Sequence, residues 1–216
     1  MDVLKYFKHF SKRRIHYFIV AFAGLFILLT AIVYFLPTTI IDYEFSEEVQ
    51  EHKSPLLHHA MLAISWFGYT WVSVALVIGT ALVFILFKHY KEALFVVLTS
   101  IIWVITFGIK VLINRPRPSE DFVDVMVNAE HQSFPSGHTS FYVVFFGFII
   151  FLMLFRNEIP KLIRYTIIIF SLFLILTVPF SRVYLGAHWF TDVAAGFVLG
   201  LLILYTLLRL FYQSFL

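Results

Sequence analysis

Six apolar stretches, separated by short polar segments, divide the chain. The stretches cover residues 15–36, 71–87, 93–113, 138–155, 162–180 and 188–209. Each is close to the roughly 20 residues that an α-helix needs to cross the hydrocarbon core of a bilayer. A further apolar piece, residues 55–68, is too short to cross comfortably, which favours an interfacial or partly inserted helix. The pattern predicts six transmembrane helices and one short helix.

The composition supports this interpretation. Of the 216 residues, 61% are hydrophobic and only 13% are charged, whereas about a quarter of the residues in a soluble domain are charged. The absence of cysteine excludes disulfides, thiolate metal sites and cysteine nucleophiles. No repeat or low-complexity linker divides the chain. We therefore predict an all-α integral membrane protein, with residues 1–216 forming one six-transmembrane-helix bundle.

The N-terminal segment, residues 1–14, is basic and precedes the first apolar stretch. Such a start is also typical of a signal peptide. The stretch at 15–36 is long enough to span, however, and no small-residue cleavage site follows it. The sequence therefore predicts an uncleaved first transmembrane helix.

The cationic residues are unequally divided between the two ends of the predicted helices. With six crossings, both termini and the turns at 88–92 and 156–164 share one side. That side holds most of the 16 Lys and Arg residues, namely Lys5, Lys8, Lys12, Arg13, Arg14, Lys88, Lys91, Arg156, Lys161, Arg164 and Arg209. By the positive-inside rule this side is cytoplasmic. We expect a multi-pass plasma-membrane protein with cytoplasmic N- and C-termini.

A polar turn precedes the fourth apolar stretch, on the predicted outer side. Its sequence, residues 134–140, is Phe-Pro-Ser-Gly-His-Thr-Ser. Ser136 is a favourable helix N-cap, and Gly137 lets the backbone approach a ligand closely. The N-terminus of a helix attracts an anion such as phosphate through free N–H groups and the helix dipole. His138 would stand beside that anion as a proton donor.

Three cations fall at the same outer level. Lys110 and Arg117 follow the third apolar stretch, and Arg182 follows the fifth. Together they could surround a phosphoryl group and stabilise the charge that spreads over its oxygens during transfer. The two arginines allow bidentate contacts that a lysine cannot make.

A histidine and a carboxylate open the sixth apolar stretch. His188 and Asp192 are four residues apart and would share one face of a helix. The carboxylate could accept the Nδ1–H of the imidazole and so leave Nε2 free as a nucleophile. His138 could then protonate the leaving oxygen and later activate water. The pattern indicates a phosphohistidine route.

The combined motifs resemble the three-part signature of the type-2 phosphatidic acid phosphatase superfamily, which includes membrane lipid phosphatases. They read Lys110-x6-Arg117-Pro118, Pro135-Ser136-Gly137-His138 and Ser181-Arg182-x5-His188-x3-Asp192. The resemblance implies that the catalytic residues are the nucleophile His188, its orienting partner Asp192 and the general acid His138. It implies that the phosphate is held by Lys110, Arg117, Ser136, Gly137 and Arg182. It also implies hydrolysis without a metal or another cofactor.

Within the family, the resemblance points to the bacterial phosphatidylglycerophosphatase and undecaprenyl-pyrophosphatase group. The predicted activity is hydrolysis of a lipid phosphate or pyrophosphate at the outer leaflet, with the active site at the extracytoplasmic face. Undecaprenyl pyrophosphate and phosphatidylglycerol phosphate are the expected substrates, in cell-wall carrier recycling or lipid metabolism. A lipid-carrier-dependent phosphotransferase and a non-catalytic lipid-phosphate binder or transporter stay open as alternatives. The expected partners are the lipid phosphate and the bilayer, with no nucleic acid; the sequence does not determine the oligomeric state.

Several residues near the site have simpler interpretations. Arg115 is expected to be a surface or headgroup contact, and Tyr184 and Trp189 are expected to be interfacial belt aromatics. The segments 38–55 and 119–131 are interpreted as flexible outward segments whose roles the sequence leaves open. The acidic residues of 119–131 favour a solvated loop over the binding of a divalent ion or the screening of substrates.

Other polar and small residues leave two interpretations open. Ser181 could contact phosphate directly or merely support its loop. The adjacent His58 and His59 are interpreted as interfacial residues in preference to metal ligands, because adjacent side chains on a helix do not converge. Gly196 and Gly200 form a small-xxx-small pair, which favours close helix packing within the bundle over dimerisation.

Overall fold

The computed structural model describes residues 12–214, with side chains from residue 16 onward. This part of the chain consists of helices and loops and contains no strand. The helices are α2 (Lys12–Phe35), α3 (Ile40–Glu51), α4 (Pro55–Trp66), α5 (Thr70–Leu86), α6 (Tyr90–Leu98), α7 (Ile101–Ile113), α8 (Gly137–Phe155), α9 (Lys161–Tyr184) and α10 (Phe190–Gln213). Most of the predicted segment 1–14 lies outside the described residues.

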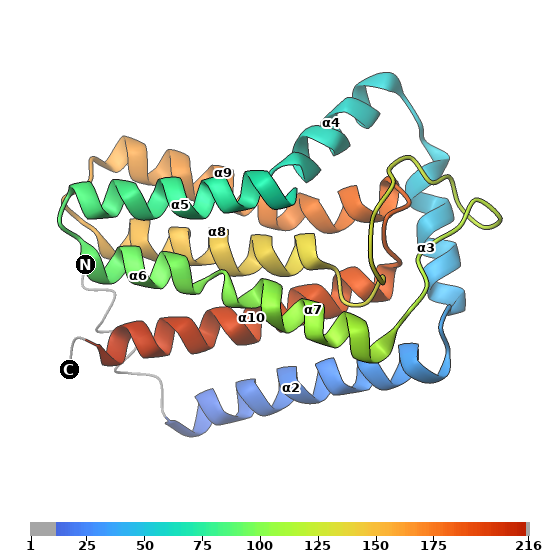
Figure 1. Ribbon diagram of the computed structural model, residues 1–216, viewed down its shortest axis with the longest axis horizontal. Coiled ribbons are helices and arrows are strands. Elements are labelled where there is room, and N and C mark those ends of the chain that lie inside the picture. Colours follow the sequence, from blue (N-terminus) through green and yellow to red (C-terminus); the bar gives the residue numbers. More distant parts are fainter. Residues whose placement is uncertain (1–11, 215–216) are drawn as a thin grey trace.

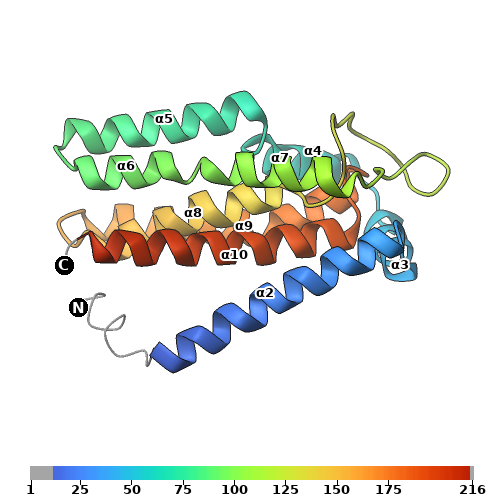
Figure 2. The ribbon, with the colours of Figure 1, turned by 60° about the horizontal axis from the view of Figure 1, so that its bottom comes forward.

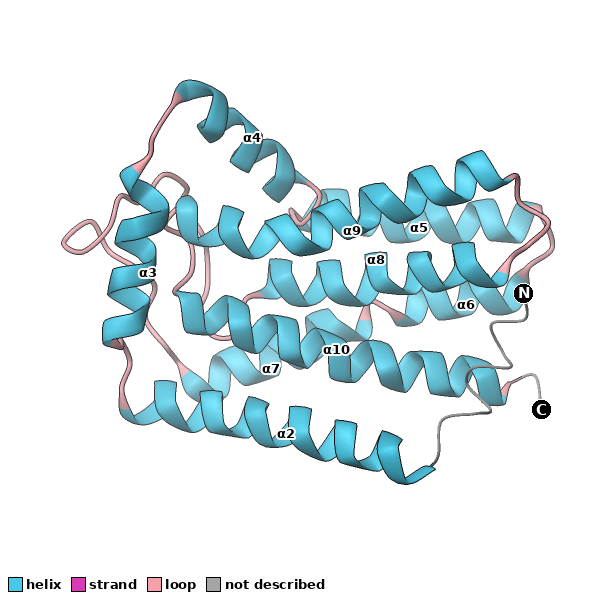
Figure 3. Cartoon of the chain, turned by 180° about the vertical axis from the view of Figure 1, so that it is seen from behind, coloured by secondary structure: helices cyan, strands magenta, loops and turns pink. Residues whose placement is uncertain are grey.

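The long helices run side by side and form an elongated bundle (Figure 1). Helices α6 and α7 follow one another along a single line, while α3 lies across one end of the bundle. Figure 2 shows α2 diverging from the other long helices at the end away from α3. Seen from behind, α4 leans outward beyond the start of α5 (Figure 3). The loops that carry the predicted site residues lie at the α3 end.

Helix α8 is the centre of the bundle and packs mainly on α9 and α10. In the 18-residue apolar stretch of α8, 72% is buried inside the protein, whereas in the corresponding stretch of α2 only 6% is buried. Both are apolar, so packing, not hydropathy, separates a central helix from one whose surface faces lipid.

The two small residues on α10, Gly196 and Gly200, make close packing possible. A Cβ at Gly200 would lie 2.7 Å from the Cβ of Val143, and one at Gly196 would lie 2.7 Å from the Ser136 oxygen. The predicted packing role of this glycine pair is confirmed.

The membrane-spanning pattern agrees with an all-helical membrane protein. Among the described residues, five helical segments are long and apolar enough to cross a bilayer, with Tyr90–Ile113 counted as one. A sixth crossing results if α4 and α5, which meet at 52°, form one bent span. The predicted helix starting at residue 188 starts instead at Phe190, because Asp192 caps its first turn by accepting from the Trp189 N–H at 2.9 Å.

The prediction of a flexible segment at 38–55 is wrong. Residues Ile40–Glu51 form α3, which begins with a capping box between Thr39 and Asp42. The second acidic segment, 119–131, has no helix but is attached to its neighbours. The Gln50 amide donates to the Asp124 carbonyl at 2.8 Å and to the Tyr184 carbonyl at 2.9 Å. Both segments thus belong to a packed cap over the α3 end of the bundle.

Candidate active site

A cavity of about 580 Å³ lies beneath this cap. Its walls come from the turn between α4 and α5, from α7, from the loop before α8, and from the ends of α8 and α9. Six of the predicted site residues line it, namely Lys110, Arg117, Gly137, His138, Arg182 and His188. Ser136 and Asp192 lie beside the cavity but do not line it.

His188 lies in the turn between α9 and α10 and is 2% exposed. Its Nε2 is 3.3 Å from the Arg117 Nη1, on the cavity side. Its Nδ1 points away from the cavity and lies 3.3 Å from the Ser133 Oγ and 3.6 Å from the Asp192 Oδ2. The ring is therefore oriented with one nitrogen toward a ligand and one toward a polar support.

Ser133 connects His188 to Asp192. Its Oγ donates to the Asp192 Oδ2 at 2.5 Å and can accept the Nδ1–H of His188. The direct Asp192–His188 separation of 3.6 Å is longer than a hydrogen bond. The carboxylate thus acts on the imidazole through a hydroxyl, where the sequence predicted direct contact. Ser133 precedes the recognised motif, so the motif itself carried no signal for it.

Burial and surrounding cations lower the pKa of His188 well below its ordinary value of 6.5. Burial is the largest cause, followed by the charges of Arg117, Lys110 and Arg182. A lowered pKa means that the ring is neutral at pH 7. With the Nδ1–H directed at Ser133, the lone pair of Nε2 faces the cavity, as a nucleophile requires.

Arg115 is not the surface or headgroup contact that the sequence predicted; its side chain is fully buried. It donates to Asp42 at 2.7 Å, to Asp192 at 2.5 Å and to the Thr191 Oγ1 at 2.7 Å. Its Nε donates to the Pro37 carbonyl at 2.7 Å. The prediction fails because two buried carboxylates from distant elements neutralise this guanidinium inside the protein.

Asp42 attaches α3 to the start of α10. One oxygen accepts from Arg115, and the other accepts from the backbone N–H and the hydroxyl of Thr191, each at 2.9 Å. The sequence showed that the segment 38–55 is acidic, but it did not show that Asp42 is buried. Asp42 and Arg115 together form a closed ionic network behind His188.

Arg117 is held by neutral acceptors only. Its Nε donates to the His131 carbonyl at 2.8 Å, its Nη2 to the Glu130 carbonyl at 2.7 Å, and its Nη1 to the Ala187 carbonyl at 2.5 Å. Burial lowers the pKa of Arg117 below its ordinary value, and the charge of Asp192 partly offsets this effect. The guanidinium keeps its charge, because arginine is not deprotonated in proteins.

The other two cations are held similarly. The Lys110 Nζ donates to the carbonyls of Gln132 at 2.5 Å and Ser133 at 3.1 Å, and the Arg182 Nη1 donates to the Ser65 Oγ at 2.7 Å. The Arg182 Nε is buried without a hydrogen-bond partner. Among residues 16–214, no ion pair joins a carboxylate to any of the three cations. The cavity therefore has an uncompensated positive charge and favours an anion.

His138 is in the first turn of α8. Its Nε2 is buried and has no hydrogen-bond partner. The ring stands edge-on to Tyr69, with centroids 5.9 Å apart, and lies over Gly68, where a Cβ would come within 2.2 Å of it. The break between α4 and α5 thus supplies the space that the imidazole occupies. No sequence motif indicated this role for Gly68.

Two predicted serines have structural partners. Ser136 caps α8, because its Oγ accepts from the Thr139 N–H at 3.4 Å and the Thr139 hydroxyl at 3.0 Å, and its own N–H donates to the Asp192 carbonyl at 3.0 Å. Ser181 donates to the Met61 carbonyl at 2.7 Å and so attaches α9 to α4. The supporting role is the one these contacts favour for Ser181.

The interpretation of Tyr184 and Trp189 as belt aromatics is wrong, since each is only 2% exposed. The Trp189 Nε1 donates to the Pro116 carbonyl at 3.3 Å, inside the cap.

His58 and His59 are adjacent in the sequence. His59 is exposed, and its Nδ1 lies 2.6 Å from the Pro55 carbonyl. Within the described part of the chain, no group of three or more His, Cys, Asp or Glu residues could hold a metal ion.

The sequence pattern of the PAP2 superfamily matches residues 89–216, which include every predicted site residue. The chain belongs to the PAP2 superfamily. It is 32% identical to the lipid A 4′-phosphatase of Porphyromonas gingivalis over 166 residues, covering 70% of this chain and 64% of that protein. It is 27% identical to phosphatidylglycerophosphatase B of Bacillus subtilis over 184 residues, covering 83% of this chain and 88% of the relative.

Two solved structures share this fold. The transmembrane PAP2-type phosphatidylglycerolphosphate phosphatase of Bacillus subtilis superposes with a TM-score of 0.78, covering 90% of this chain and 96% of that one, at 24% identity. Aquifex aeolicus LpxE superposes with a TM-score of 0.60, covering 80% and 99%, at 22% identity. The predictions of a PAP2 fold in a multi-pass membrane protein and of a phosphatase are confirmed at the level of the family.

Proposed function

We propose that this PAP2 protein hydrolyses a lipid phosphate or pyrophosphate through a phosphohistidine intermediate, without a metal ion. The observation that carries this proposal is the composition of the cavity wall. Three cations without carboxylate partners surround a cavity that His188 and His138 line, with the Nε2 of His138 unpartnered and the Nε2 of His188 beside Arg117. A phosphoryl group supplies the negative charge and the acceptors that these side chains lack.

The first half-reaction is an in-line displacement. The Nε2 of His188 attacks phosphorus, so that a P–N bond forms while the P–O bond to the leaving group breaks. His138 donates a proton to the departing oxygen. Lys110, Arg117 and Arg182 stabilise the charge on the three remaining phosphoryl oxygens. The products are a phosphohistidine and the free lipid alcohol, or a lipid monophosphate if the substrate is a pyrophosphate.

The second half-reaction restores the enzyme. His138, now lacking its proton, accepts one from water, and the oxygen attacks phosphorus. The P–N bond breaks, and inorganic phosphate leaves. Throughout, Asp192 and Ser133 hold the Nδ1–H of His188, so that Nε2 is the atom that forms and releases the bond.

The candidate substrates are lipids with a terminal phosphate at the outer leaflet. Undecaprenyl pyrophosphate and phosphatidylglycerol phosphate follow from the sequence, and the relatives add the 4′-phosphate of lipid A.

The distribution of cations supports an outward-facing cavity. Since the chain has no cysteine, a single one placed at the exposed position of Glu48 would test this orientation. An impermeant maleimide should label it in intact cells; labelling only after lysis would reverse the orientation.

The decisive test is phosphate release by the purified protein in the presence of EDTA. The panel contains these three lipids and phosphatidic acid, each also tested with His188→Ala and with His59→Ala, a histidine outside the site. We expect one or more lipids to be hydrolysed by the wild type and His59→Ala but not by His188→Ala. Release that persists in His188→Ala would overturn the mechanism. Release that needs an added acceptor would indicate a phosphotransferase.

A further inference from the structure

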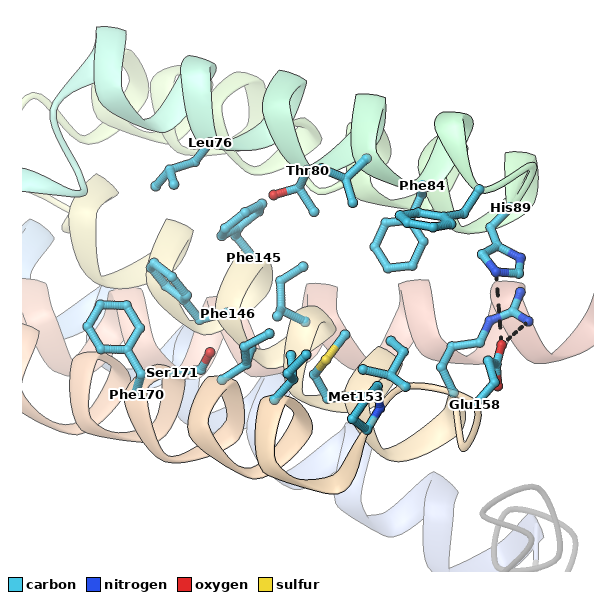
Figure 4. A pocket seen from close by; sticks show the side chains of 18 residues that line it. Leu76, Thr80, Phe84, His89, Phe145, Phe146, Met153, Glu158, Phe170 and Ser171 are labelled. Atoms are coloured by element: carbon cyan, nitrogen blue, oxygen red, sulfur yellow. Dashed lines mark hydrogen bonds and ion pairs between the residues drawn. The ribbon is translucent and has the colours of Figure 1, made fainter.

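A second cavity lies in the other half of the bundle (Figure 4). Its volume is about 700 Å³, and its walls come from α5, α8, α9 and the turns that join them. The side chains that face it are mostly apolar, among them Leu76, Phe84, Phe145, Ile149, Met153 and Phe170. No residue of the catalytic cavity lines it.

The two cavities follow one another along the same helices. On α8, Phe141 lines the catalytic cavity, and Phe145, one turn further, lines the second; their rings stack with centroids 5.2 Å apart. On α5, Ser73 lines the first and Leu76 the second. The two cavities are therefore neighbours along α5 and α8, about one helical turn apart on each helix.

The second cavity lies deeper than one leaflet. At about 1.5 Å per residue, Met153 is about 22 Å along α8 from His138. The hydrocarbon core is about 30 Å thick, so the chains of one leaflet end about 15 Å from its boundary. A chain that starts at the catalytic cavity and reaches Met153 must cross the midplane of the membrane.

The far end of the cavity does not favour an anionic headgroup. Arg156 donates to Glu92 and, at 3.0 Å, to Glu158, whose carboxylate also lies 3.9 Å from the His89 Nε2 (Figure 4). One arginine is thus shared by two carboxylates. The charge of the arginine that lines the cavity is thus neutralised within the protein, which leaves the apolar part of the cavity for a chain end.

We propose that this cavity binds the distal part of one long apolar chain of the substrate. The inference rests on the proposed function. It selects, among the lipid phosphates, a carrier with a single polyprenyl-type chain, because acyl chains of ordinary length end near the midplane. The cavity then makes chain length a determinant of catalytic efficiency.

The first test fills the cavity and compares two chain lengths that share one headgroup. Thr80 lines the cavity, so Thr80→Phe should shorten it. The substrates are undecaprenyl pyrophosphate and farnesyl pyrophosphate. We expect the ratio of kcat/KM for the long over the short substrate to fall about tenfold or more, since chain segments are displaced from an apolar site. Thr206→Phe, on the exposed side of α10, should leave both values unchanged. An unchanged ratio in Thr80→Phe would overturn the proposal.

The second test does not depend on hydrolysis. A long-chain prenyl phosphate with a diazirine at its far end is photolysed in the His188→Ala protein, and labelled peptides are identified by mass spectrometry. We expect labels on the segments of α5, α8 and α9 that line the cavity, residues 76–87, 145–153 and 163–171. Labels confined to other helices would overturn the tail site, whatever the phosphatase assay shows. Labels in these segments from a protein that hydrolyses no lipid would support the site and contradict only the proposed function.

Discussion

Two charged regions lie on opposite sides of His188, and their cations are neutralised differently. Behind the ring, Arg115 is paired with two buried carboxylates and holds α3 against α10. In front of it, Arg117 is bonded only to neutral groups, namely three backbone carbonyls and the ring of His188. The two arginines are two residues apart in the sequence. The difference teaches that the function of a buried cation depends on its partner: a carboxylate makes it part of the scaffold, and neutral acceptors leave its charge for a ligand.

Removing the scaffold arginine should cost the most. Arg115→Ala leaves Asp42 and Asp192 as buried carboxylates without their cation, which should lower the free energy of unfolding by about 3–5 kcal/mol. Thermal and denaturant unfolding in detergent would measure the loss. Arg209→Ala, which removes an exposed arginine, is the matched control. If both variants unfold alike, the network around Arg115 does not stabilise the fold.

Removing the ligand-side arginine should affect catalysis instead of stability. Arg117→Ala should lower kcat/KM by about 100- to 1000-fold, since one preorganised donor to the phosphoryl oxygens is lost. Its unfolding free energy should change by less than about 1 kcal/mol, because the carbonyls it leaves can be hydrated from the cavity. A phosphate-release assay and an unfolding curve on the same preparation would check both values. Equal activity to wild type would break the distinction between the two arginines.

Ser133 lies at the boundary between the two regions, and its removal should have an intermediate effect. Ser133→Ala interrupts the path from Asp192 to the Nδ1 of His188, so kcat should fall about tenfold, the value of one hydrogen bond. KM should stay the same, because Ser133 does not line the cavity. Steady-state kinetics would separate the two constants. A rise in KM with unchanged kcat would mean that Ser133 shapes the binding site and does not orient the nucleophile.

The smallest effect should be a shift in pH dependence. Burial and three cations lower the pKa of His188, so its neutral, nucleophilic form persists below pH 6.5 and is lost as the pH falls through the lowered pKa. Arg117→Gln removes one of these charges and should move the acid limb of the kcat/KM profile to higher pH. Both proteins are assayed with the same substrate, so that the titration of the substrate's phosphate contributes equally to both pH profiles. An acid limb that does not move would mean that Arg117 does not affect His188.

The helices and most residues that line the cavity were predictable because their signals are local. Apolar length identified the membrane segments, and the motifs around His138 and His188 identified residues that line one cavity. The supporting residues were not predictable. Ser133, Gly68 and Asp42 act through partners 55 or more residues away, and a polar residue in a loop has no pattern that reveals such a partner.

By itself, the sequence determined the all-helical membrane class, the family and the set of residues able to perform phosphoryl transfer, since hydropathy and motif spacing depend only on neighbours along the chain. Only the tertiary structure decided which charges are neutralised. Arg115 meets Asp42 across 73 positions, while Arg117 meets no carboxylate among the described residues. The physical reason is that the cost of a buried charge is set by what packs around it, and packing brings together elements that the sequence keeps apart.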